Sequence, residues 1–252
     1  ALLAVKYALN WRNYLSIPKG DLKSINKKTI INAWIKKLIK KKSFSEFDGL
    51  EMLRAFGVSV AGYKLLYNEI DLLNSIDKLS YPLVLKTAEN INHKSDVGGV
   101  KLNLTSKKDL IKEYHELNNR LGPKALLMEM HKGSVEICIG AIIDDDFGPV
   151  IVLSAGGTLI EVIDDTISSL APIDPQTAKQ LLLKLNISKM FNGVRGHKPI
   201  NLEDLCNQIS NISFMISDLG NNLKELDINP IICSEKGAWA VDCLAIGNNH
   251  KK

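Results

Sequence analysis

The sequence predicts a mixed α/β (α+β) fold arranged in two lobes. From residue 45 onward, stretches with apolar residues at helical spacing alternate with short apolar stretches of the kind that form strands. Two pairs of these short stretches are joined by turn-rich segments, a pattern that is typical of hairpins. The chain has 252 residues, of which 45% are hydrophobic, so it can form a sizeable core and fits one bilobed unit.

The N-terminal part differs from the rest in charge. Residues 1–45 hold 11 of the 32 Lys and Arg but one of the 28 Asp and Glu, which leaves 21 − 27, or −6, for the remainder. Such a basic segment indicates either a nucleic-acid or membrane surface, or a solvated helix face. Aromatic residues are not interleaved with the lysines as single-strand stacking requires, which favours the solvated face. We therefore expect a helical linker over residues 1–43, with one helix at Lys28–Lys40.

Membrane and export signals are absent from the sequence pattern. No apolar run approaches the ~20 residues that a membrane span needs, and the N-terminal apolar stretch has no cleavage pattern. We therefore expect a cytoplasmic protein with neither a membrane nor a nucleic acid as partner.

The first lobe is expected over residues 44–128. Its first element is a helix at Glu46–Phe56, which ends at Gly57, a residue that favours helix C-termini. The other expected elements are a strand near Val60, a helix at Asn68–Leu79, strands at Leu83–Thr87 and Gly99–Leu104, a capped helix at Ser106–Asn119 and a strand at Ala125–Met130.

The second lobe is expected over residues 129–247. It combines two hairpins with two helices, whose apolar residues recur at helical spacing. The elements are a hairpin of Val135–Ile143 with Val150–Leu153, a helix from Pro175 to about Leu185, a helix at Asn201–Leu219, and a hairpin of Lys224–Cys233 with Ala238–Leu244.

The loop after the strand at Leu83–Thr87 is the most informative motif. The strand carries Lys86, whose ammonium can lie against phosphate oxygens, and the paired Gly98 and Gly99 let the backbone approach an anion closely. The loop also carries His93, an imidazole that can act as a nucleophile near neutral pH. The alternatives are a lysine extended from a strand end and a structural loop histidine. Together these residues predict phosphoryl transfer.

The C-terminal hairpin offers oxygen ligands for a hard cation. Asn229 and Asp242 are expected on adjacent strands, and the strand period of two puts Asp227 on the same face as Asn229. Mg2+ prefers such oxygen ligands, supplemented by phosphates and water. We therefore predict a metal site of Asn229, Asp242 and Asp227, with Asp227 as a ligand or as an acid behind the ligands. The alternative for Asp242 is a buried partner of a lysine.

These motifs occur in one unbroken order over residues 44–247 that resembles a known family. The chain resembles the ATP-grasp half of NDP-forming acyl-CoA synthetases, such as ADP-forming acetyl-CoA synthetase, and more distantly the succinyl-CoA synthetase beta subunit. The resemblance implies a two-lobed ATP-grasp fold with a helical N-terminal linker, and ATP/ADP and Mg2+ as cofactors. It also implies a CoA-binding ligase module as partner, either an alpha subunit or the N-terminal part of a fused chain, in a hetero-oligomer or a homodimer of the full enzyme.

The resemblance also implies roles for individual residues. His93 receives a phosphoryl group from a histidine of the CoA-binding module, Glu161 orients a histidine and Arg195 clamps a phosphate. Glu129 and Met130 form the hinge that binds the base, and Glu136 reaches the ribose. The implied nucleotide-binding residues are Lys86, Lys94, Ser95, Asp96, Gly98, Gly99, Glu129, Met130 and Glu136. The alternative for each acid is an exposed carboxylate, that for Arg195 is a loop salt bridge, and Asp96 either orients the imidazole or contacts the metal.

The function implied by the resemblance is the nucleotide half of the reaction acyl-CoA + ADP + Pi = acid + CoA + ATP. One departure matters, because Ser169 stands where many members of the family have an arginine before Leu-Ala-Pro. The alternative is therefore a non-catalytic nucleotide-binding regulatory module of a larger acyl-CoA-synthetase-like or acetyltransferase protein. A nucleic-acid-binding protein is a third possibility, based only on the N-terminal lysines.

Overall fold

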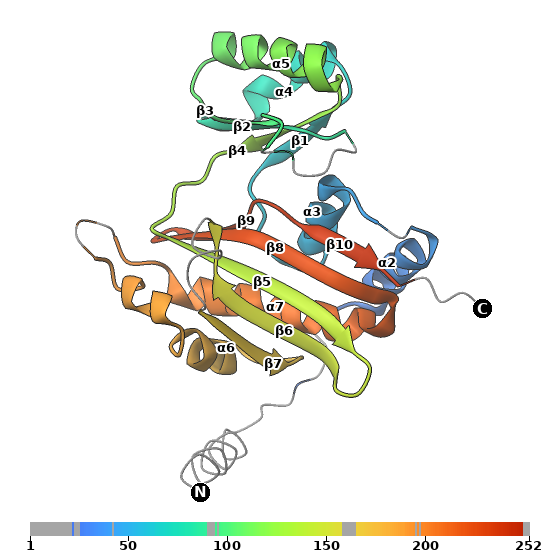
Figure 1. The fold of residues 1–252 in the computed structure, drawn as a ribbon, viewed down its shortest axis with the longest axis vertical. Coiled ribbons are helices and arrows are strands. Elements are labelled where there is room, and N and C mark those ends of the chain that lie inside the picture. The colour runs from blue at the N-terminus through green and yellow to red at the C-terminus, as the bar shows by residue number, and fades with distance from the viewer. Residues whose placement is uncertain are drawn as a thin grey trace, which may run out of the picture.

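Two separate β-sheets divide the chain into a small lobe and a large lobe, as the computed structural model in Figure 1 shows. The structure describes residues 22, 26–41, 43–89, 94, 96–157, 165–194, 196 and 198–248. This mixed, two-lobed architecture confirms the predicted fold class. Among the described residues, no helix has both the length and the apolar character that crossing a membrane requires.

The small lobe is an antiparallel sheet with helices on one face (Figure 1). Its strand order is β1-β4-β2-β3. The strands are β1 (Tyr63–Leu66), β2 (Leu83–Thr87), β3 (Val100–Leu104) and β4 (Ala125–Glu129), and the helices are α4 (Glu69–Ser75), the short 3-10 helix η1 (Ile76–Lys78) and α5 (Lys107–Leu121). Side chains of Asn68 and Ser106 accept the N–H groups of Asp71 and Asp109, so each α-helix begins at a capped residue.

The two faces of the small sheet pack against different partners. Leu83 and Leu85 of β2 belong to the core under α4 and α5. Val84, between them, belongs to the core that continues into the large lobe. Because side chains alternate along a strand, Lys86 shares the face of Val84 and is directed toward the large lobe.

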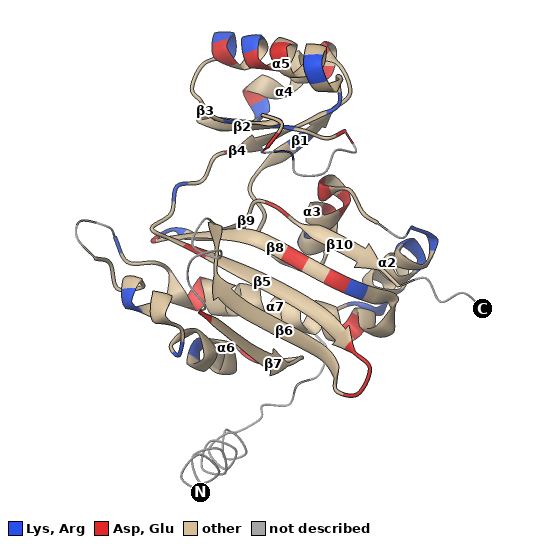
Figure 2. Ribbon diagram, in the orientation of Figure 1, with Lys and Arg blue, Asp and Glu red and all other residues tan. Residues whose placement is uncertain are grey.

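The large lobe is a six-stranded antiparallel sheet with helices on one face (Figure 1). The strand order is β10-β8-β5-β6-β7, and β9 pairs with β8. The strands are β5 (Val135–Asp144), β6 (Gly148–Ala155), β7 (Thr166–Leu170), β8 (Leu223–Ser234), β9 (Gly237–Ala240) and β10 (Leu244–Gly247). The helices are α6 (Pro175–Leu182), η3 (Asn186–Met190), α7 (Leu202–Leu219) and η4 (Gly220–Asn222). Strand β8 contains charged residues, whereas β6 contains none (Figure 2).

Two N-terminal helices pack on the large lobe. Helix α2 (Lys28–Lys40) contacts α7 and β10, and α3 (Glu46–Ala55) contacts β10. The buried Leu50 and Leu53 of α3 belong to the large core, so this helix packs with the second lobe although it precedes the small sheet. The predicted boundaries between linker and first lobe, at 43/44, and between first and second lobe, at 128/129, stay predictions.

Several predicted elements differ from the structure. The strand predicted near Val60 is an isolated bridge, and β1 begins at Tyr63. The strand predicted at Ala238–Leu244 is divided into β9 and β10, because Pro230 on the opposite strand has no N–H to donate. Strand β7 was not predicted. It lies at the sheet edge and its Thr-Ile-Ser-Ser-Leu sequence has little apolar character, so pairing with β6 defines it.

Candidate functional site

A cavity of about 750 Å³ lies between the face of the small sheet that carries Lys86 and the start of α3. Its lining combines apolar side chains with charged ones of both signs. The lining includes Leu65, Val100 and Leu126 of the small sheet, the lysines Lys86 and Lys94, and Glu46 and Asp242 from the large-lobe side. A cavity of this size and mixed lining suits a ligand with one apolar and one anionic part.

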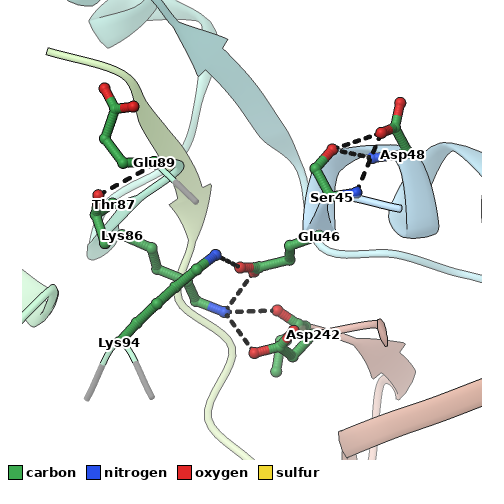
Figure 3. Close-up of polar contacts among 9 residues, drawn as sticks. Ser45, Glu46, Asp48, Lys86, Thr87, Glu89, Lys94 and Asp242 are labelled. Carbon is green, nitrogen blue, oxygen red and sulfur yellow. Dashed lines mark hydrogen bonds and ion pairs between the residues drawn. The ribbon is translucent and has the colours of Figure 1, made fainter. Parts of the chain in front are cut away.

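Two lysines of the small lobe converge on a single carboxylate at this cavity (Figure 3). The Nζ atom of Lys86 donates to Oε1 of Glu46 at 2.8 Å, and that of Lys94 donates to Oε2 of the same residue at 2.9 Å. Lys86 also donates to the carbonyl of Val241 at 2.8 Å and lies 3.7 Å from Oδ2 of Asp242. The Lys86 and Glu46 side chains are only 10% and 7% exposed, so this pair is shielded from water, whereas the Lys94 and Asp242 side chains are 24% and 46% exposed.

Lys86 and Glu46 keep each other charged. Burial opposes ionisation of Glu46, but the adjacent Lys86 and Lys94 ammonium groups outweigh it and lower the pKa of that carboxyl. Burial likewise opposes protonation of Lys86, and the charges of Glu46 and Asp242 outweigh it and raise the pKa of the lysine. Asp242 differs, because burial raises the pKa of its carboxyl and the nearby Lys86 ammonium group only partly offsets that effect. The charged pair at the centre of the cluster is therefore Lys86 with Glu46.

Two glycines allow these elements to approach each other. A Cβ at Gly49 of α3 would lie 2.8 Å from the carbonyl oxygen of Cys243, so the glycine lets the first turns of α3 lie against the segment that carries Asp242. The N–H of Gly99 donates to the carbonyl of Lys94 at 2.7 Å, and a Cβ there would lie 2.8 Å from the same oxygen. This close turn brings Lys94 back beside Lys86.

The predicted metal residues lie together, with one correction. Asp242 is not on a strand but in the break between β9 and β10. The pairs Ile231↔Ala240 and Leu244↔Asp227 flank that break in one continuous register, so Asp242 lies directly across from Asn229. The lysine partner that we considered for Asp242 also exists, since Lys86 lies 3.7 Å away.

The donor set fits a magnesium ion that a nucleotide brings with it. Oδ1 of Asn229 accepts the N–H of Gly157 at 3.1 Å, and Oδ1 of Asp227 accepts the thiol of Cys138 at 3.4 Å. No group of three His, Cys, Asp or Glu side chains with the geometry of a metal site occurs within the described ranges. A cation here would therefore take an amide and carboxylate oxygens from the protein and the rest from phosphate and water, as Mg2+ commonly does.

The predicted hinge lies at the other end of the small sheet. Leu83 pairs with Glu129, whereas Lys86 pairs with Leu126, so three residues, or roughly 10 Å, separate the hinge from the lysine along the strands. Glu129 accepts the N–H of Ser80 at 2.8 Å, and the Met130 N–H donates to the carbonyl of Pro82 at 2.9 Å. Neither residue lines the cavity, and neither does Glu136. A ligand that contacts both ends would have to lie along the sheet face.

Of the remaining predicted site residues, some lie within the described residues and others lie outside them. Asp96 is exposed and Gly98 has a φ of +64°, which favours glycine. Four predicted site residues lie outside the described residues: His93, Ser95, Glu161 and Arg195.

Comparison with known proteins identifies the family of this chain. The family model described as "ATP-grasp domain" matches residues 38–246. This chain belongs to the ATP-grasp family. The ATP-grasp chain is 37% identical over 207 residues to the 4-hydroxybutyrate–CoA ligase [ADP-forming] of Nitrosopumilus maritimus, with 79% of this chain and 30% of the ligase covered.

Two other relatives have nearly the same length as the ATP-grasp region. The beta subunit of acetate–CoA ligase [ADP-forming] I of Pyrococcus furiosus is 30% identical, with 80% of this chain and 90% of the subunit covered. A solved structure of acetyl-coenzyme A synthetase 1 from Ca. Korarchaeum cryptofilum has a TM-score of 0.75 and 28% identity, with 86% of this chain and 98% of that chain covered. These matches confirm the resemblance that the sequence motifs indicated.

Glu46 lines the cavity and bonds to both lysines, and sequence reasoning missed it. Its position follows from α3, whose N-terminus is fixed by a capping box between Ser45 and Asp48. The sequence predicted this helix to within one residue of its C-terminal end, but it assigned no role to Glu46. The sequence contains no signal that pairs Glu46 with Lys86 and Lys94, which lie 40 and 48 residues away.

Proposed function

We propose that this chain is the nucleotide-binding half of an ADP-forming acyl-CoA synthetase. The observation that carries the proposal is the convergence of Lys86 and Lys94 beside a cavity whose other side holds Asp242. The Korarchaeum relative was solved with coenzyme A and Mg-AMPPCP and with its phosphohistidine segment pointing towards the nucleotide binding site. The sequence similarity and the lysine geometry together support the same half-reaction in this chain.

The proposed step moves a phosphoryl group between His93 and a nucleotide. In the direction of ATP synthesis, a terminal phosphate oxygen of ADP attacks phosphohistidine, the P–N bond breaks, a P–O bond forms and the imidazole is released. Lys86 and Lys94 would hold and neutralise the phosphates, because this chemistry depends mainly on positioning and electrostatics. Bound Mg2+ would supply further charge neutralisation, with Asn229, Asp242 and Asp227 as the residues that hold it. Arg195 and Glu161 would clamp a phosphate and orient a histidine.

The nucleotide would lie along the small sheet. Its phosphates would lie at Lys86, its base at the hinge of Glu129 and Met130, and its ribose near Glu136. The glycine-bearing loop with Ser95, Asp96, Gly98 and Gly99 would close over the phosphates. Leu65, Val100 and Leu126 add apolar surface on the cavity side of this path.

A partner is needed for the whole reaction. The chain spans about 30% of the length of the Nitrosopumilus ligase but 90% of the Pyrococcus beta subunit. We propose that a CoA-binding module, either a separate alpha subunit or another part of a fused chain, supplies the CoA and acyl sites and the first phosphohistidine. The assembled enzyme would then be a hetero-oligomer or a homodimer of the full chain.

Labelling with γ-32P-ATP and Mg2+ tests the phosphocarrier step. We expect protein-bound phosphate that is labile in acid and stable in base, lost in His93→Ala and retained in His115→Ala. His115 is a matched control because it lies on α5, away from the cavity, and pairs with Glu69. Bound nucleotide without His93-dependent label, even with the CoA-binding module present, would contradict the proposal.

A regulatory module is the second candidate, and Ser169 favours it. The hydroxyl of Ser169 donates to the carbonyl of Leu170 at 3.3 Å, so this position of β7 offers no positive charge to a phosphate. If the missing arginine limits transfer, Ser169→Arg should raise the rate of His93 labelling. A wild-type chain that binds ATP but takes no label, while Ser169→Arg does, would identify a regulatory module.

A further inference from the structure

The two lysines are already occupied by a carboxylate from the same chain. Glu46 presents one oxygen to Lys86 and the other to Lys94, which is how two lysines would also grip two oxygens of a phosphate (Figure 3). The Glu46 side chain is 7% exposed and lines the cavity between the lobes. The carboxylate therefore occupies the place where the proposed function requires phosphate.

The pairing also crosses between the lobes. Glu46 belongs to α3, which packs on β10 of the large lobe, whereas Lys86 is on β2 and Lys94 is in the following loop of the small lobe. Lys86 makes a second crossing contact to the carbonyl of Val241. A ligand that takes the lysines from Glu46 would exchange these contacts between lobes for contacts to itself.

Repulsion between Glu46 and the phosphates favours the exchange. Glu46 bonds to both Lys86 and Lys94, and Asp242 lies 3.7 Å from Lys86, so the lysines already have anionic partners when a polyphosphate arrives. A nucleotide that entered beside an unmoved Glu46 would place its phosphates next to a shielded carboxylate, where like charges repel strongly. Either the carboxylate moves away or a cation accompanies the phosphates.

We infer that Glu46 is an internal competitor for the phosphate site, displaced from Lys86 and Lys94 when a nucleoside diphosphate or triphosphate binds. This inference rests on the proposed function, because it takes the lysines as the phosphate site. In the nucleotide-free chain Glu46 neutralises the lysines and links the lobes. Displacement of Glu46 then couples nucleotide occupancy to α3.

The inference predicts an unusual gain of affinity on removal of a buried charge. Glu46→Gln keeps the shape of the side chain and removes the competing charge, so ADP in EDTA should bind about tenfold more tightly than to the wild type. The advantage should shrink when Mg2+ is present, because the cation itself relieves the repulsion. A role in which Glu46 only holds the lysines in place predicts weaker binding with and without metal.

Calorimetric titration of ADP into the chain, once in EDTA and once in Mg2+, separates these cases. Glu51→Gln is the matched control, because it removes one carboxylate from the same helix but contacts Tyr63 and Arg54 instead of the lysines. We expect its affinities to equal those of the wild type. Glu46→Asp is a second variant that keeps the charge but is too short to span both lysines, and it should tighten metal-free binding by a smaller factor.

The possible results are distinct. Tighter metal-free binding by Glu46→Gln, with Glu51→Gln unchanged, supports the inference. Unchanged or weaker metal-free binding in both Glu46 variants overturns the inference. If binding is weaker only in the presence of Mg2+, Glu46 is instead a metal ligand. If neither the wild type nor any variant binds ADP, the proposed function itself fails, and the inference fails with it.

Discussion

The two sides of the proposed site differ in whether their charged side chains already have partners of opposite charge. On the small-lobe side, Lys86 and Lys94 are neutralised by Glu46 and Asp242 within hydrogen-bond or ion-pair distance. On the β8 face, Asp227 accepts only the thiol of Cys138, and within the described residues it forms no ion pair. One side thus holds cations that already have anions, and the other holds an acid for which the described part of the chain supplies no cation.

This difference teaches what kind of ligand the site accepts. A bare polyphosphate would satisfy neither side, because it must displace Glu46 and leaves the oxygens near Asp227 and Asn229 without a cation. A nucleotide that carries Mg2+ brings both the anion and the cation that the two sides lack. The comparison therefore predicts that binding of nucleotide and of metal should depend on each other.

Removal of Lys86 from the ion cluster should have the largest effect on the free energy of unfolding. Lys86→Met leaves Glu46 shielded from water with only Lys94 as a partner, and we expect a loss of ~3 kcal/mol of unfolding free energy. Urea unfolding would measure it, with Lys64→Met as the control, since Lys64 is exposed on β1 and its substitution should cost less than about 0.5 kcal/mol. Equal stability of the two variants would show that the cluster does not link the lobes.

Changes at the proposed metal ligands should act on the Mg2+ dependence of nucleotide binding. Asp242→Asn and Asn229→Ala should each raise the Mg2+ concentration needed for half-maximal ADP binding by about tenfold, because each removes or weakens an oxygen ligand. Asp145→Asn, an exposed acid in the β5–β6 turn, should leave this concentration unchanged. A Mg2+ dependence that is the same in all three variants would place the metal elsewhere.

The smallest expected effect is on how the stability of the protein changes with pH. The lowered pKa of Glu46 means that its contribution to stability is complete above the ordinary value of 4.5 and is lost as pH falls below it. The raised pKa of Lys86 means that its contribution is complete below 10.5 and is lost as pH rises above it. The contribution of the Lys86–Glu46 pair to the free energy of unfolding should therefore be constant between these limits, and thermal unfolding across pH would measure it.

The Glu46→Gln variant sharpens this pH comparison. Residue 46 no longer titrates in the variant, so the fall in melting temperature on the acid side should be shallower than in the wild type. Some acid dependence should remain, because burial opposes ionisation of Asp48 but bonds from Lys41 and Ser45 outweigh it and lower the pKa of that carboxyl. An acid limb that is identical in both proteins would mean that Glu46 is not charged in the folded chain.

Local patterns explain which parts of the fold could be predicted from the sequence. The helix at Lys28–Lys40 and the strand at Leu83–Thr87 were predicted with the bounds that the structure has. Periodicity and end residues determine such elements within a few neighbouring positions. Strand β7 and the division between β9 and β10 depend on partners distant in sequence, so no local pattern revealed them.

The site shows the same limit. Lys86, Lys94 and Asp242 were predicted from their motifs, and the structure brings them to one cavity. Glu46 was missed because an acid in the first turn of a helix is common, and only the packing of α3 on β10 brings it to the lysines. Pairing across 40 or more residues is a property of the tertiary structure and not of any local pattern.

The most direct test of the central claim is the affinity of the chain for Mg2+·ADP, compared between the wild type and Lys86→Met with Lys64→Met as control. The account predicts that the wild type and Lys64→Met bind equally and that Lys86→Met loses affinity by about a hundredfold, since two charge-assisted contacts to phosphate disappear. Equal affinity in all three proteins would contradict the assignment of the phosphate site to Lys86.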